Sequence, residues 1–293
     1  SNSGAATTLM TADSDRPHVH AGVVGSPISH SLSPVLHRAA YAALGLSQWN
    51  YHADDVAAGG LTDFVHDRDR SWVGLSVTMP GKEEALSLAT SASERARRTG
   101  AANTLIRSGQ QWWADNTDID GITRAFAEHG CHQGRRAWLV GSGATARSAL
   151  IAFADMGVRE VIVQVRAEPR AETLRLAEQL DISTQVATYD QGPPDLASLD
   201  VAVSTVPAGG GMPMPQAFTG ALRSLSLAAM DVVYYPQVTD WSRALGEHGA
   251  LLVDGSSMLL HQACVQVELM TDRLAPVEDM RTAMRRELAA REP

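Results

Sequence analysis

A glycine-rich turn between a buried strand and a helix constrains the fold of this chain more than any other sequence feature. Residues 137–140 form a short apolar run, Gly-Ser-Gly-Ala-Thr-Ala follows at 141–146, and a helical pattern continues to about Met156. Further strands are expected at 161–165, 201–205, 230–234 and 251–253. Strands that alternate with helices at this spacing predict a doubly wound parallel sheet.

The residues before this turn alternate in the same way. Residues 1–17 are small, polar and aperiodic, and we expect them to be a flexible leader outside the fold. Strands are expected at 20–25, 49–53 and 73–78, helices at 34–44, 61–68 and 82–89, a hairpin at 104–107 with 111–114, and a helix at 119–129. This pattern predicts a second α/β unit with a mostly parallel sheet.

The predicted architecture is therefore α/β with two domains. Everything after Gly255 is helical in pattern and has no strand of its own, so it should pack on the first unit. We expect residues 18–118 with 256–293 to form a substrate-binding catalytic domain, and residues 119–255 to form a Rossmann-like dinucleotide-binding domain.

Composition excludes several classes of protein. The chain has 293 residues, of which 44% are hydrophobic, so disorder, collagen and disulfide scaffolds are excluded. A net charge of -9 argues against a nucleic-acid partner, and no apolar run is long enough to span a membrane. Two cysteines without metal-like spacing fit a reducing compartment, so we expect a cytoplasmic protein without a metal. We expect this protein to be a monomer or a homodimer.

The glycine turn predicts where a dinucleotide binds. The first glycine permits the tight turn, the second lets the backbone approach a pyrophosphate, and the N–H groups of the following helix receive the anion. The cofactor-binding residues predicted here are Gly141, Ser142, Gly143, Ala144 and Thr145. At the end of the next strand, Arg166 suits the 2′-phosphate of NADP, whereas the nearby Glu168 keeps NAD open as the alternative.

Lysine is nearly absent from this chain. Of its 24 basic residues, one is a lysine, Lys82. Arginine stays protonated in proteins, whereas lysine can release a proton and take it back. Lys82 closes the segment Val-Thr-Met-Pro-Gly-Lys at 77–82, at the carboxyl end of a predicted strand, where open α/β sheets bind ligands. Further hydroxyl groups stand at Ser31 and Ser33, where Ser33 is expected to cap a helix that begins at Pro34.

Together these segments resemble the shikimate dehydrogenase family, from residue 22 to about residue 271. The motifs run in family order: Ser-Leu-Ser-Pro at 31–34, the segment at 77–82, Gly-Ala-Ala-Asn-Thr at 100–104, Asp-Asn-Thr-Asp at 115–118, the glycine turn, Asp-Val-Val-Tyr at 231–234, and Gly-Ser-Ser-Met-Leu at 255–259 followed by Gln262. The resemblance implies NADP-dependent, reversible reduction of 3-dehydroshikimate to shikimate, a step of aromatic amino-acid biosynthesis.

The resemblance also implies residue roles. The hydroxyls and carboxylate of shikimate would be held by Ser31, Ser33, Thr78, Asn103, Asp118, Tyr234 and Gln262. Lys82 and Asp118 would be the catalytic acid/base pair, and Val232 and Gly255 would join the cofactor-binding residues. Oxidation of a secondary alcohol needs a base that takes the hydroxyl proton as hydride leaves, and the reverse reaction needs an acid. We expect Lys82 to serve the 3-hydroxyl, with domain motion around a cleft between the two domains.

The sequence departs from the family pattern at four places. Arg38 and Ser76 each stand where asparagine is common, Val-Arg-Ala at 165–167 replaces Asn-Arg-Thr, and Ser-Thr-Val-Pro at 204–207 approximates Asn-Ala-Thr-Pro. Three alternatives therefore stay open: a quinate/shikimate dehydrogenase that prefers NAD, a relative acting on an amino analogue, and a non-catalytic sensor of a nucleotide or shikimate. The pair of serines favours shikimate, and the presence of both Lys82 and Asp118 argues against a sensor.

Overall fold

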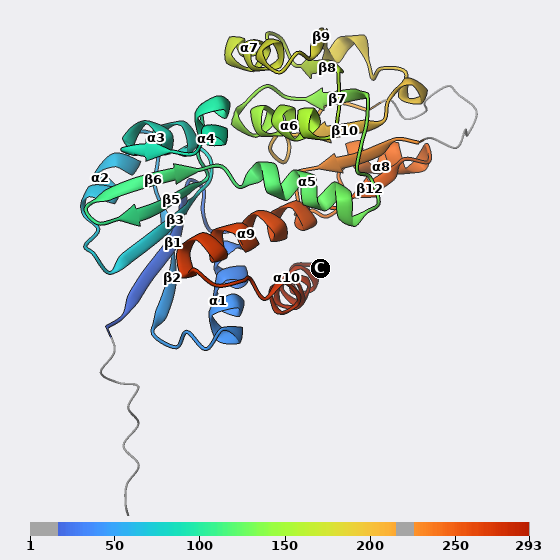
Figure 1. The fold of residues 1–293 in the computed structure, drawn as a ribbon. Helices are drawn as coiled ribbons and strands as arrows, with labels where there is room; N and C mark the ends of the chain where they lie inside the picture. The colour runs from blue at the N-terminus through green and yellow to red at the C-terminus, as the bar shows by residue number, and fades with distance from the viewer. Residues whose placement is uncertain (1–16, 215–225, 293) are drawn as a thin grey trace, which may run out of the picture.

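Two six-stranded sheets, each covered by helices on both faces, make up the protein (Figure 1). The computed structural model describes residues 17–214 and 226–292. The predicted leader, apart from Pro17, lies outside the described residues. Among the described residues, no helix is both long and apolar enough to cross a membrane.

The first sheet is mixed, with more parallel than antiparallel strand pairs. It contains β1 (Val19–Gly25), β2 (Trp49–Asp55), β3 (Trp72–Val77), β4 (Ser91–Ala92), β5 (Thr104–Ser108) and β6 (Gln111–Asp115), in the order β2-β1-β3-β5-β6-β4. β2, β1 and β3 are parallel, and the predicted hairpin β5–β6 adds antiparallel pairs. The helices of this unit are α1 (Ser33–Ala43), α2 (Leu61–His66), α3 (Lys82–Leu88) and α4 (Glu94–Thr99).

The second sheet is parallel throughout the described strand pairs. It contains β7 (Arg136–Val140), β8 (Glu160–Val165), β9 (Ser183–Thr188), β10 (Val201–Ser204), β11 (Ala228–Asp231) and β12 (Leu251–Val253). The order β9-β8-β7-β10-β11-β12 is that of the doubly wound nucleotide-binding fold, which confirms the predicted fold class. Its helices are α5 (Asp118–Glu128), α6 (Ala144–Asp155), α7 (Ala171–Gln179) and α8 (Asp240–Glu247).

The C-terminal helices join the core of the first unit. Leu260, Ala263 and Val267 of α9 (Gly255–Thr271) and Met280 of α10 (Val277–Arg291) share one buried cluster with residues of β1 and α1. α9 also lies beside α5 between the two sheets (Figure 1). The two sheets are therefore connected through two packed helices.

Several element boundaries differ from those expected. β11 ends at Asp231, so Val232 and Tyr234 follow the strand instead of lying within it. α1 begins at Ser33 with Leu32 as its N-cap, so the prediction that Ser33 caps the helix is wrong. The physical reason is that the Ser31 hydroxyl accepts the Ser33 N–H at 3.3 Å. Five elements lack a corresponding prediction from the sequence, namely α4, α7, α8, β4 and β9.

Glu128 connects α5 with both C-terminal helices. Its carboxylate accepts a hydrogen bond from Ser257 at 2.7 Å, lies 3.1 Å from Nε2 of His261, and forms an ion pair with Arg281. Burial by itself would raise the pKa of Glu128, but the hydrogen bonds from Ser257, Arg281 and His261 outweigh it and lower this pKa from its ordinary 4.5 to about 2.

We expect Glu128→Gln to reduce the free energy of unfolding at pH 7 by about 1 kcal/mol. A lowered folded-state pKa gives stability that is fully present above pH 4.5 and is lost as the pH falls toward 2. Urea unfolding at pH 7 and at pH 3 measures this, and the difference from the unaltered protein should shrink at pH 3. Glu278→Gln is the control, because Glu278 also pairs with Arg281 but its side chain is 80% exposed. A difference independent of pH would contradict the prediction.

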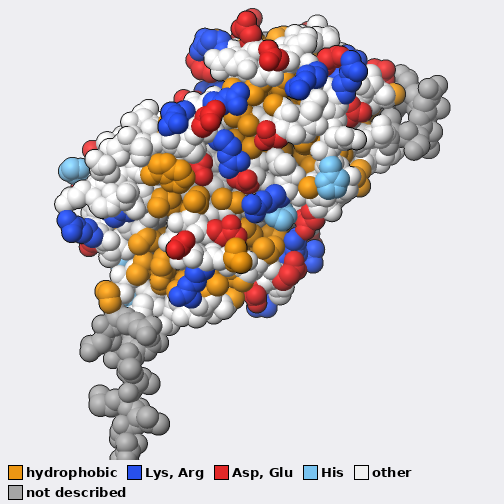
Figure 2. Space-filling model, in the orientation of Figure 1, with side chains coloured by type: hydrophobic (Ala, Val, Ile, Leu, Met, Phe, Trp, Pro, Cys, Tyr) orange, Lys and Arg blue, Asp and Glu red, His pale blue; other side chains and the backbone are white. Residues whose placement is uncertain are grey.

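Charged side chains mix on the visible surface. On the face drawn in Figure 2, acidic and basic side chains lie among one another without forming a continuous basic patch. The described residues contain no group of three or more His, Cys, Asp or Glu side chains that could hold a metal ion.

Candidate active site

A cavity of about 190 Å³ lies where the two units meet. Its lining includes all eight residues predicted for catalysis and substrate binding, namely Ser31, Ser33, Thr78, Lys82, Asn103, Asp118, Tyr234 and Gln262. Three predicted cofactor residues, Thr145, Val232 and Gly255, line it as well. The fold thus brings into one cavity residues that are widely separated in the sequence.

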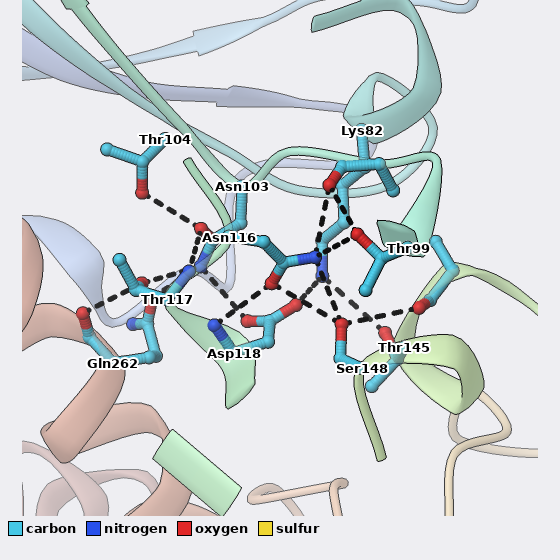
Figure 3. A network of polar contacts seen from close by, with 12 residues as sticks. Lys82, Thr99, Asn103, Thr104, Asn116, Thr117, Asp118, Thr145, Ser148 and Gln262 are labelled. Atoms are coloured by element: carbon cyan, nitrogen blue, oxygen red, sulfur yellow. Dashed lines mark hydrogen bonds and ion pairs between the residues drawn. The ribbon is translucent and has the colours of Figure 1, made fainter. Parts of the chain in front are cut away.

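Lys82 and Asp118 form an ion pair in this cavity. Each is the first residue of its helix, Lys82 of α3 and Asp118 of α5. The Lys82 Nζ atom lies 2.6 Å from Asp118 Oδ2, and the side chains are 15% and 7% exposed (Figure 3). The same Nζ lies 3.5 Å from the Thr145 hydroxyl of α6. The amine therefore sits between the two units, within reach of a group bound in the cavity.

Asn103 holds the Asp118 carboxylate from its other side. Its Nδ2 donates to Asp118 Oδ1 at 3.0 Å and lies 3.2 Å from Gln262 Oε1. Its Oδ1 accepts the N–H of Thr117 at 2.8 Å, which fixes the orientation of the amide (Figure 3). Because each oxygen of Asp118 has a partner, the carboxylate orients the amine.

The glycine turn has the geometry of an anion-binding site. Gly141 has a φ of +105°, and a Cβ there would lie 2.5 Å from Thr205 Oγ1. Nothing lies within 4 Å of a Cβ placed on Gly143, which leaves space for a ligand near its backbone. α6 begins after Gly143 without a side-chain cap, so its first N–H groups can receive an anion. These residues fit a dinucleotide pyrophosphate.

Comparison with known proteins identifies the family. Residues 23–105 match the profile of the shikimate dehydrogenase substrate binding domain, and residues 255–285 that of the shikimate 5'-dehydrogenase C-terminal domain. A shikimate dehydrogenase (NADP(+)) of Halobacterium salinarum is 35% identical over 269 residues, 91% of this chain and 98% of that protein. This chain belongs to the shikimate dehydrogenase family.

Two solved structures of this family resemble the fold closely. The shikimate dehydrogenase of Mycobacterium tuberculosis is 39% identical, with a TM-score of 0.79 over 92% of this chain and 99% of that one. The shikimate 5-dehydrogenase of Thermus thermophilus, solved in complex with NADP(H) and shikimate, is 27% identical, with a TM-score of 0.77 over 92% of this chain and 99% of that one.

The remaining predicted cofactor residues surround the turn. Arg166 is exposed directly after β8, as expected of a residue at a strand end. The Ser142 hydroxyl accepts the N–H of Arg170 at 3.1 Å, so it supports the turn locally. Gly255 lies so close to the carbonyl oxygens of Asp231 and Val233 that a Cβ would overlap them. The backbone after β11 can therefore approach the start of α9.

Two residues without a predicted role contact neighbours of the site, although neither lines the cavity itself. Arg170 lies at the start of α7, is exposed, and pairs with Glu83 at 3.4 Å. The Asn116 amide donates to Ser148 of α6 at 3.1 Å, and its oxygen accepts the N–H of Asp118 at 3.2 Å (Figure 3). A cation four residues after Arg166 was the available signal for Arg170, whereas the Asn116 bond to α6 has no signal in the sequence.

Two of the four departures from the family pattern, Arg38 and Ser76, contact Tyr51. Arg38, where many members have asparagine, donates to the Tyr51 carbonyl oxygen at 2.7 Å. At the other such position, the Oγ atom of Ser76 lies 2.5 Å from the hydroxyl oxygen of Tyr51. Ser76 lines the cavity, so this departure changes the wall of the site itself.

Proposed function

We propose that this protein catalyses the reversible, NADP-dependent reduction of 3-dehydroshikimate to shikimate. The observation that carries the proposal is the Lys82–Asp118 pair, 2.6 Å apart, in a cavity that is lined by hydroxyl and amide side chains and borders the α6 end of the glycine turn. Membership of a family with NADP(+)-dependent relatives supports the same reaction.

The cavity wall suits a small polyhydroxylated acid. Six uncharged polar side chains are proposed to bind its hydroxyls and carboxylate: Ser31, Ser33, Thr78, Asn103, Tyr234 and Gln262. Hydroxyl and amide groups can both donate and accept hydrogen bonds, as such a substrate requires. Ser33, Asn103 and Gln262 are buried, where an unpaired polar group is costly, so analogues that lack a hydroxyl should bind more weakly.

Lys82 is proposed as the acid and base of the reaction. In the oxidation direction its Nζ, as the uncharged amine, takes the proton of the 3-hydroxyl, and in reduction the ammonium returns a proton to the forming alkoxide. Asp118 orients the amine, and Asn103 in turn holds Asp118. A bound nicotinamide cofactor supplies or accepts the hydride.

Arg166 is proposed to select NADP over NAD. A charge-assisted bond to the 2′-phosphate contributes about 1.5–3 kcal/mol, so Arg166→Gln should raise the KM for NADP roughly 10- to 100-fold. The KM for NAD should change little. Dissociation constants from nucleotide fluorescence titration give a readout independent of turnover, and Arg175→Gln on the exposed face of α7 is the control. Equal weakening of both cofactors would contradict the assignment.

Turnover of shikimate and quinate, each with NADP and NAD, tests the proposed function. The proposal expects the highest kcat/KM with shikimate and NADP. A preference for NAD with both acids would favour the quinate/shikimate dehydrogenase. Turnover of an amino analogue alone would favour the relative that acts on such an analogue. Binding of shikimate without any turnover would favour the sensor.

The assignment of substrate binding to one unit and cofactor binding to the other is also a proposal. We infer that residues 18–118 with 256–293 bind substrate and that residues 119–255 bind cofactor, and that the units move relative to one another during turnover. Both cysteines, Cys131 and Cys264, are free, which supports a cytoplasmic location. A monomer and a homodimer both remain compatible with this mechanism.

A further inference from the structure

Three buried side chains, Tyr51, Ser76 and Gln266, are hydrogen-bonded in series at one wall of the cavity. The hydroxyl of Tyr51 lies 2.5 Å from Ser76 Oγ, which donates to Gln266 Oε1 at 2.8 Å. Gln266 Nε2 donates to the carbonyl oxygen of Asn103 and to Thr104 Oγ1, both at 3.0 Å. Ser76 and Gln266 line the cavity, whereas Tyr51 is 2% exposed and lies one layer further back.

The backbone carbonyl group of Asn103 fixes the direction of each hydrogen bond in this series. A backbone carbonyl oxygen can only accept, so the Gln266 amide must present Nε2 to Asn103 and Oε1 to Ser76. Ser76 has a single proton and gives it to Oε1. The Tyr51 hydroxyl must therefore donate to Ser76, because two oxygens cannot share a bond without a proton.

The neighbouring His37 agrees with this direction. Burial lowers the pKa of His37 to about 3, although its bond to Gln266 opposes the shift, so the ring is neutral. Its Nε2 lies 3.3 Å from Gln266 Oε1 and can donate there in one tautomer. The ring also stacks on Tyr51, with centroids 4.1 Å apart, while Arg38 holds the Tyr51 backbone. Tyr51 is thus held at both ends.

We propose that Tyr51 and Gln266 are positioning residues that fix Ser76 as a hydrogen-bond acceptor toward the cavity. With its proton committed to Gln266 and one lone pair occupied by Tyr51, Ser76 has only an acceptor position left for a ligand. The wall therefore selects a substrate with a hydroxyl donor at this point and disfavours a ketone, ether or carboxylate oxygen there. This inference rests on the proposed function and names a determinant of its specificity.

Fluorinated substrates test the acceptor role in the unaltered protein. Fluorine in place of a hydroxyl accepts hydrogen bonds weakly and donates none. Of the two analogues of shikimate fluorinated at C4 or C5, one should bind about 5- to 100-fold more weakly than shikimate. In Ser76→Ala this difference should disappear, because the acceptor is gone. Unchanged binding of both analogues to the unaltered protein would overturn the proposal.

Tyr51→Phe tests the positioning role with the ring retained. We expect the KM for shikimate to rise about 2- to 10-fold, with kcat and the KM for NADP within twofold of the unaltered values. In the Ser76→Ala background the same substitution should have a clearly smaller effect on KM, and what remains reports the contact of the Tyr51 hydroxyl with Ser33. Equal effects in both backgrounds would overturn the proposal.

Tyr41→Phe is the matched control. Tyr41 belongs to the same buried cluster, and its hydroxyl finds no hydrogen-bond partner among the residues that the structure describes. Its loss should leave the KM for shikimate unchanged. Circular dichroism establishes that each variant folds, and if Tyr51→Phe does not, the fluorinated analogues still decide. Absence of shikimate turnover by the unaltered protein would instead refute the proposed function, which is a separate result.

Discussion

Replacing Lys82 with arginine is expected to lower kcat for shikimate oxidation by roughly 10²- to 10⁴-fold. Arginine keeps the positive charge and can still pair with Asp118, so the fold and the binding of shikimate should be largely preserved. It cannot release a proton in the range where enzymes work, and the acid/base step is therefore lost. Steady-state kinetics with NADP, together with a dissociation constant for shikimate, separate the chemical step from binding.

The single lysine also allows a measurement that does not depend on activity. Apart from the α-amino group, an amine-directed reagent has one side-chain target in this chain, Lys82. Shikimate should protect it from modification, and Lys82→Arg should remove the labelling altogether. Near-normal turnover by a folded Lys82→Arg variant would refute the acid/base role, whatever the labelling shows.

The strands and helices that bury one apolar face were readable from the sequence. Periodicity located β1, β2 and β3 of the first sheet and the strand, turn and helix around Gly141, because these segments have strong hydrophobic patterns. β9 escaped because it is an edge strand with mostly exposed or half-buried residues and no clear alternation. α8 was missed because it is short. It packs on β11 and β12, and the local sequence does not reveal these contacts.

The candidate site was predictable to the extent that its residues stand in motifs. Lys82, Asn103 and Asp118 each lie in a short segment whose order along the chain resembles one family, and they line one cavity. The hydrogen bonds that orient them are contacts between distant elements. Tyr51 has the pattern of an ordinary β-strand aromatic residue, and only the fold shows that its hydroxyl reaches Ser76 of β3, on the far side of β1.

Asp118→Asn is the second substitution with a large expected effect, a fall in kcat of about 10²-fold or more. Asparagine has nearly the same shape, so the bond from Asn103 can be kept. With that bond kept, the NH2 group of the new amide faces the Lys82 ammonium, so donor meets donor and the amine loses the charged partner that orients it. Stopped-flow measurement of nucleotide absorbance would locate the loss in the chemical step.

Asp120→Asn is the matched control, because Asp120 lies in the same helix and forms a more exposed ion pair with Arg95. Its loss should leave kcat within twofold. If Lys82 and Asp118 act as one unit, the double variant Lys82→Arg/Asp118→Asn should be little slower than the slower single variant. Multiplication of the two single effects would mean that the carboxylate contributes independently of the amine, and the assignment of Asp118 as its orienting partner would then be wrong.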